Sequence, residues 1–375
     1  MFLEAKGGGS DAGQRYLPVA EMGLAELEAI RLILRGGSVV DWRRLHFSDA
    51  GEVSRFLRLN LFDLDDPQDE RRLRAILAQA VEYLRTAFGY RVAEAVAHPA
   101  DVRDLFLFAS GAKEPRRHRR IACVVLKCMH VVHHLVAREL LFRTPIREAD
   151  LAARLDRRIA AEARRMREHG FPVVQFAGNV KTRSSLVTKL LAKRETVAAQ
   201  IFDRLRYRIL TEHPDQIPSV VWHLAQTLFP FNYAVPGQTQ NSLVRFRELV
   251  GAHPNAQALI AALQAPLDVE ARDPTLHNEF TADGYRVLNF VVDMPVRIDE
   301  LLPSDGALSE ELGRVVFVLV EFQVLDVETA RRNEEGEASH ARYKRRQLKQ
   351  VLRRLSRGLV VPKRKARRPR RGVKE

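Results

Sequence analysis

One apolar run in the last quarter of the chain limits what this sequence can fold into. Residues 315–325, VVFVLVEFQVL, are apolar at almost every position, which is typical of a central strand covered on both faces. Glu321 interrupts the run, and burying an unpaired carboxylate is costly. Because side chains alternate between faces, Glu321 shares its face with Leu319 and Gln323. The sequence therefore predicts a central strand that carries a carboxylate in need of a cation.

The remaining pattern predicts that helices come first and strands follow. Apolar residues recur at helical spacing through the first 170 residues, most clearly in residues 19–35, 69–88 and 121–142. After residue 170 the pattern changes to short β-like runs separated by helices. We expect strands at 172–177, 201–210, 287–292 and 315–325, and helices at 181–193, 217–228 and 326–359. This order favours an α+β domain with a mixed sheet.

The chain is expected to divide into three parts. Residues 1–170 form a helical N-terminal region, residues 171–345 form the mixed-sheet domain, and residues 346–375 form a basic helix end and a disordered tail. The net charge of +14 is concentrated at the C-terminus, where residues 342–375 hold sixteen Lys and Arg against one acid. The rest of the chain is nearly neutral. A contact with RNA or the ribosome is therefore expected only of the basic tail.

The composition favours a cytoplasmic protein. The two cysteines, Cys123 and Cys128, cannot form a disulfide framework. No uninterrupted apolar run approaches the length of a membrane span, so we expect no membrane contact. Three histidines, His130, His133 and His134, share one face of a predicted helix. A metal site is one interpretation of this group, and a partly buried helix whose histidines bond neighbouring groups is the favoured one.

Two carboxylates on predicted strands, Asp203 and Glu321, form a candidate magnesium site. Paired carboxylates commonly hold Mg²⁺ against substrate phosphates. The alternative is that Asp203 caps its strand and that Glu321 pairs with a buried arginine. Cations that could bind a polyphosphate surround the pair in sequence, namely Lys181, Lys189 and Arg208. Both interpretations of the carboxylates stay open at this level.

Five segments in order resemble the synthetase domain of the RelA/SpoT proteins, which make the alarmone (p)ppGpp. The resemblance covers about residues 171–345. It implies a nucleotidyltransferase-like synthetase fold and transfer of pyrophosphate from ATP to the 3′-hydroxyl of GDP or GTP. The segments are a helix start at 180–189, a strand with an acid at 201–209, a Gly-Tyr loop at 284–289, a Glu-x-Gln strand at 320–324, and the following helix at 334–344.

The resemblance implies a role for each matching residue. Asp203 and Glu321 would be catalytic and would bind Mg²⁺. Lys181, Ser185, Lys189 and Arg208 would hold the ATP phosphates. Tyr285 would stack on the guanine of the acceptor and Gln323 would support that site, while His340 lies in the matching helix after the Glu-x-Gln strand.

Four positions depart from the family pattern. Asn179 and Arg206 stand where the family has Arg and Gly, and Asn289 and Leu325 stand where it has His and Arg. An active alarmone synthetase with an altered acceptor or rate is the favoured interpretation. The alternatives are a toxin-like enzyme that pyrophosphorylates the 3′ end of tRNA, and a catalytically degenerate relative that binds nucleotide or RNA.

Overall fold

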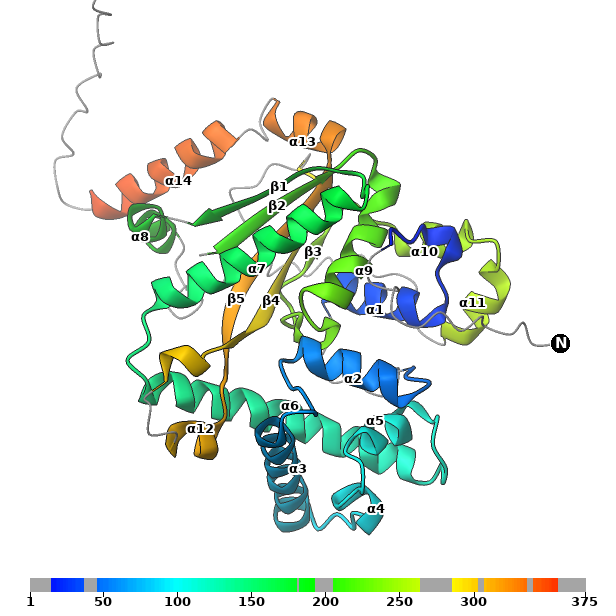
Figure 1. Cartoon of the computed structure of the whole chain (residues 1–375). Helices are drawn as coiled ribbons and strands as arrows, with labels where there is room; N and C mark the ends of the chain where they lie inside the picture. The colour runs from blue at the N-terminus through cyan, green and yellow to red at the C-terminus, as the bar shows by residue number, and fades with distance from the viewer. Residues whose placement is uncertain are drawn as a thin grey trace, which may run out of the picture.

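The computed structural model describes residues 15–36, 46–180, 182–192, 205–263, 285–302, 307–335 and 340–356. Helices and strands alternate in the second half of the chain, as the sequence predicts (Figure 1). The helices that precede the first strand are α1 (Leu24–Arg35), α2 (Ala50–Leu59), α3 (Pro67–Phe88), α4 (Glu94–Ala97), α5 (Arg103–Ser110), α6 (His118–Arg143) and α7 (Glu148–Glu168). Helices are therefore confirmed throughout the described part of the N-terminal region.

The strands that the structure describes all lie after residue 170. These are β1 (Val173–Val180), β2 (Leu205–Thr211), β3 (Gln240–Asn241), β4 (Leu288–Arg297) and β5 (Val315–Asp326). The helices between and after them are α8 (Arg183–Ala192), α9 (Ile217–Thr227), α10 (Phe246–Gly251), α11 (Ala256–Leu263), α12 (Ala307–Leu312), α13 (Val327–Glu334) and α14 (His340–Leu355).

The strands form one mixed sheet in the order β1-β2-β5-β4-β3. β2 and β5 run parallel, whereas β1 pairs antiparallel with β2, and β4 pairs antiparallel with both β5 and β3. The apolar run of residues 315–325 is thus a central strand, as expected. The mixed α+β class predicted from the sequence is confirmed at this level.

One face of the sheet is apolar and lies against helices. Tyr207 and Ile209 of β2 and Phe322 of β5 point to this face and are buried. They belong to one hydrophobic core with residues of α1, α7 and α9. Burying this face removes large aromatic and branched side chains from water and stabilises the layer. The opposite face of the sheet carries the polar residues of β2 and β5.

Helices α2 to α6 build a second hydrophobic core beyond one end of the sheet (Figure 1). α6 joins the two parts, because it packs against α3 and α5 and also against β5. Among the helices that the structure describes, α6 alone has the length and apolar composition of a membrane span. Its Ala122, Val125 and Leu126 are buried in the second core, which is also what a soluble protein's core helix does.

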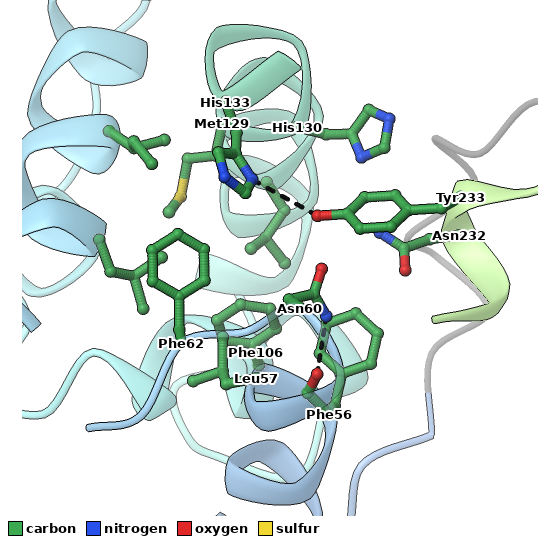
Figure 2. A pocket seen from close by; sticks show the side chains of 13 residues that line it. Phe56, Leu57, Asn60, Phe62, Phe106, Met129, His130, His133, Asn232 and Tyr233 are labelled. Carbon is green, nitrogen blue, oxygen red and sulfur yellow. Dashed lines mark hydrogen bonds between the residues drawn. The ribbon is translucent and has the colours of Figure 1, made fainter. Parts of the chain in front are cut away.

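Two histidines of α6, His133 and His134, contact neighbouring polar groups, and Figure 2 shows the hydrogen bond between His133 and Tyr233. His134 places Nδ1 3.0 Å from the carbonyl oxygen of His130, and its Nε2 lies 3.4 Å from Oδ2 of Asp293 on β4. Its ring stacks on Phe317 of β5, with ring centroids 4.0 Å apart. The described residues contain no group of three or more potential metal-ligating side chains. The contacts of His134 agree with the favoured interpretation, a partly buried helix whose histidines bond neighbouring groups.

Gly178 of β1 is required by close contact with Tyr207. A Cβ atom at this position would lie 2.6 Å from Cε1 of Tyr207. The tyrosine cannot move away easily, because its hydroxyl donates a 2.9 Å hydrogen bond to Asp156 of α7. We expect Gly178→Ala to lower the free energy of unfolding by about 1–3 kcal/mol through overpacking. Urea unfolding checks this value, and Gly251→Ala, where a Cβ meets nothing within 4 Å, is the matched control; equal effects in both variants would contradict the steric explanation.

Candidate functional site

The polar face of the sheet gathers side chains from β2, β4 and β5. Arg206 lies opposite Glu321 in the parallel pair, and Arg208 lies opposite Gln323. Asn289 of β4 lies opposite Gln323 from the other side. Residues opposite one another in a ladder point to the same face. Segments more than 80 residues apart in the chain therefore meet here, and they include three of the five segments singled out in the sequence.

Glu321 is held by Arg206. Its Oε2 accepts a 2.7 Å hydrogen bond from Nε of Arg206, and its Oε1 accepts a 3.2 Å bond from Nη2. Glu321 is only 4% exposed, so the guanidinium supplies the cation that a buried carboxylate requires. Of the two interpretations that the sequence left open, the structure shows pairing with an arginine.

This pairing bears directly on the predicted magnesium site. Each carboxylate oxygen of Glu321 accepts one hydrogen bond from the guanidinium of Arg206 and keeps another acceptor site that could hold a Mg²⁺ ion. The positive charge of Arg206 would oppose a metal ion there, so the magnesium site stays a prediction. Asp203 lies outside the described residues, and its predicted role as a strand cap or a magnesium ligand stays a prediction.

Two polar atoms on this face have no hydrogen-bond partner among the residues that the structure describes. They are Nε of Arg208, a donor, and Oδ1 of Asn289, an acceptor, and both are buried. Buried polar atoms are nearly always bonded in folded proteins, and an unpaired one costs about 1–3 kcal/mol. The two atoms flank Gln323 in the ladder. A donor and an acceptor left open on either side of one residue are suited to a ligand with an anionic part and a hydrogen-bonding part.

Tyr285 lies beside this row and is fixed by it. Nε2 of Gln323 donates a 2.9 Å hydrogen bond to the hydroxyl oxygen of Tyr285. Burial raises the pKa of Tyr285, although the nearby charges of Arg206 and Arg208 act against that rise. The phenol is therefore neutral at pH 7 and lies close to both guanidinium groups. Gln323 therefore holds the hydroxyl of Tyr285, while the part of both residues in a guanine site stays a prediction.

The start of α8 carries a cluster of hydroxyl groups. Oγ1 of Thr182 lies 3.0 Å from Oγ of Ser185 and 3.1 Å from Oγ of Ser184. Ser185 is exposed, and Lys189 is half-buried one turn further along the helix. α8 follows β1 directly, and β1 is the neighbour of β2 in the sheet. Lys181 lies outside the described residues, and so does the side chain of His340, so these two predicted nucleotide contacts stay predictions.

Comparisons with known proteins add a likeness to alarmone synthetases. No family model matches the chain, and no curated protein matches it. Among solved structures, it is similar to small alarmone synthetase 1 of Bacillus subtilis bound to its product pppGpp, with 15% identity, a TM-score of 0.29, and coverage of 54% of this chain and 82% of the other. A second structure of that synthetase has 16% identity and a TM-score of 0.30, and the match covers 54% of this chain and 84% of the other. Small alarmone synthetase 2 of the same organism has 18% identity and a TM-score of 0.27, and the match covers 59% of this chain and 98% of the other.

These likenesses are too weak to carry an argument on their own. The identities are below 20% and the TM-scores are below 0.5. What is proposed below therefore rests on the polar face of the sheet and on the order of the five sequence segments.

Two residues of this face were missed as parts of the site. Arg206 and Asn289 were noted only as departures from a family pattern, yet they complete the rows around Glu321 and Gln323. The alternation of β2 offered a signal for Arg206, because residues 206 and 208 must share a face. No local signal identifies Asn289, since its place opposite Gln323 depends on the register of β4 and β5.

Proposed function

We propose that this protein binds a guanine nucleotide on the polar face of the sheet and transfers pyrophosphate from ATP to its 3′-hydroxyl. The observation that carries the proposal is the pair of unpartnered atoms on Arg208 and Asn289, on either side of Gln323. A guanidinium binds phosphate through charge-assisted hydrogen bonds. An amide oxygen accepts from the N–H groups of a base. A nucleotide offers both partners in one molecule.

In this proposal each described side chain has a part. Arg208 binds a phosphate of the acceptor or donor, and Tyr285 presents its ring to the guanine base, since every base offers a π-face. Gln323 holds Tyr285 in place through its hydrogen bond. Ser185 and Lys189 of α8 bind the ATP phosphates, together with Lys181.

The reaction is a displacement at the β-phosphorus of ATP. The 3′-oxygen of the acceptor forms a bond to that phosphorus, the bond from phosphorus to the oxygen that bridges to the α-phosphate breaks, and AMP leaves. The hydroxyl proton passes to a base. Catalysis here depends on positioning the two nucleotides and neutralising their charge. Arg206 contributes a fixed positive charge. Glu321 is the candidate base, but its hydrogen bonds to Arg206 occupy some of the lone pairs that would accept the proton.

A second candidate function follows from the same ion pair. If Glu321 stays bonded to Arg206 when nucleotide is bound, the guanidinium makes it a weaker base and a weaker metal ligand. The protein would then be a nucleotide-binding relative without transfer activity. The ion pair between Arg206 and Glu321 is the specific observation that favours this alternative.

Label transfer distinguishes these functions. We expect the purified protein, given Mg²⁺ and γ-labelled ATP, to place label on GDP or GTP, and we expect Glu321→Gln to abolish the transfer. Deacylated tRNA is offered in a parallel reaction, because the basic C-terminal segment makes RNA the alternative acceptor. Label on tRNA alone would replace the proposal with an RNA-modifying enzyme. No label on any acceptor, with nucleotide still bound, would leave only the binding function.

A further inference from the structure

Helix α14 (His340–Leu355) carries an exposed apolar stripe. Leu348, Leu352 and Leu355 are 40%, 47% and 53% exposed. Their spacing of four and three residues places them in one line along the helix. Single exposed leucines are ordinary on protein surfaces, but three in one line form a continuous apolar surface. These three residues are called the leucine stripe below.

The contact of α14 with the rest of the fold uses another side of the helix. α14 packs mainly on α8 and lies beside it at the edge of the structure (Figure 1). Val351 of α14 is buried in a small cluster with Ala192, and Leu191 packs against this cluster. Arg354 donates a hydrogen bond through Nη1 to the carbonyl oxygen of Leu191. The leucine stripe therefore lies next to this contact and outside it.

Positive charge borders the leucine stripe. Four basic side chains of this part of α14 are exposed, namely Lys344, Arg345, Lys349 and Arg353. The last three recur every four residues, so they form a line parallel to the leucines. Residues 340–356 contain no Asp or Glu, and residues 357–375 add nine Lys and Arg against one acid. The apolar surface is therefore joined to a strongly cationic one.

This combination defines the chemistry of the partner. The partner has to cover apolar side chains and to supply negative charge directly beside them. The surface of an anionic lipid bilayer does both, because its acyl chains bury apolar side chains and its headgroups attract cations. RNA supplies the charge but no apolar surface for the leucines. A second copy paired through α14 would bring two cationic helices together without an acid on either.

We propose that α14 binds anionic membrane surfaces, with the leucine stripe buried at the boundary between headgroups and acyl chains. The lysine and arginine side chains beside the stripe extend to the headgroup phosphates while their methylene groups stay on the apolar side. The expectation of no membrane contact rested on the length of uninterrupted apolar runs, and a helix that lies on a membrane surface does not need such a run. The proposal does not rest on the function proposed for the sheet.

Sedimentation with vesicles tests this proposal on the full chain. One set of vesicles contains phosphatidylcholine alone, and the other contains phosphatidylcholine mixed with phosphatidylserine. We expect binding to the anionic vesicles to be at least about tenfold stronger. Leu348→Ser/Leu352→Ser should weaken that binding about tenfold, because two side chains no longer leave water on binding. Lys349→Gln/Arg353→Gln should also weaken it about tenfold, because two headgroup attractions are lost.

A matched control separates the leucine stripe from exposed apolar side chains in general. Val131 and Leu135 of α6 are also exposed and lie four residues apart. Val131→Ser/Leu135→Ser should bind anionic vesicles as the wild type does. Circular dichroism and thermal unfolding should give wild-type values for all three variants, since every substituted side chain is exposed.

Several results would overturn the proposal. Absence of binding to anionic vesicles, or equal binding to both kinds of vesicle, would remove the anionic membrane as the partner. Binding that falls in the variant without the two cations but not in the variant without the two leucines would make α14 a surface for phosphate contacts, as in RNA binding. A changed oligomeric state of the leucine variant in light scattering, with vesicle binding intact, would make the stripe a contact between copies. An equal loss in the α6 control would show that the leucine stripe has no special part.

Discussion

Glu321→Ala is expected to lower the free energy of unfolding by about 2–3 kcal/mol. The substitution removes the carboxylate that bonds Arg206 at 2.7 Å, and the guanidinium, only 29% exposed, stays partly buried near Tyr285. Breaking a buried ion pair by removing one partner typically costs about 3–5 kcal/mol, and the partial exposure of Arg206 reduces that cost. Urea unfolding at pH 7 measures the change.

Two further variants make this result specific. Glu328 of α13 also pairs with arginines, Arg331 and Arg332, but on the surface. Glu328→Ala should leave stability unchanged within error, because exposed ion pairs contribute little. The double variant Arg206→Met/Glu321→Leu should recover most of the stability lost in Glu321→Ala. A loss in Glu328→Ala as large as that in Glu321→Ala would contradict the importance of burial at this pair.

Arg208→Ala is expected to weaken nucleotide binding by about ten- to a hundredfold. Removing a charge-assisted hydrogen bond costs about 1.5–3 kcal/mol, which corresponds to that range of affinity. The guanidinium of Arg208 bonds nothing that the structure describes through Nε, so its loss should leave the fold intact. Titration with GDP measures the affinity, and circular dichroism and thermal unfolding check the fold.

Asn289→Ala tests the other unpartnered atom. It should weaken GDP binding less than Arg208→Ala does, because a neutral hydrogen bond contributes about 0.5–1.5 kcal/mol. Arg331→Ala, which removes an exposed arginine of α13, is the control for charge alone. Equal affinities in the wild type and in Arg208→Ala would remove the polar face from the nucleotide site.

The central strand shows how far the sequence could be interpreted. Residues 315–325 were predicted as a buried strand, and β5 covers Val315–Asp326. The need of Glu321 for a cation was also predictable from burial alone. The identity of that cation was not, because Arg206 lies 115 residues away and only the β2–β5 register brings the two together.

The short strand β3 was not predictable. The strands expected from the sequence do not include residues 240–241, yet Gln240 and Asn241 pair with Asn289 and Leu288 of β4. A two-residue strand has no periodicity of its own and exists through its partner. The same reason applies to the site: the row of Arg208, Gln323 and Asn289 is a product of register, which no single segment encodes.

A crystal structure with bound GDP tests most directly that the polar face of the sheet is the nucleotide site. We expect a phosphate oxygen of GDP within hydrogen-bond distance of Nε of Arg208, and a donor of the base within that distance of Oδ1 of Asn289, with Tyr285 beside the ring. GDP bound away from β2, β4 and β5, or a polar face unchanged and empty at saturating GDP, would contradict the proposed site and with it the proposed function.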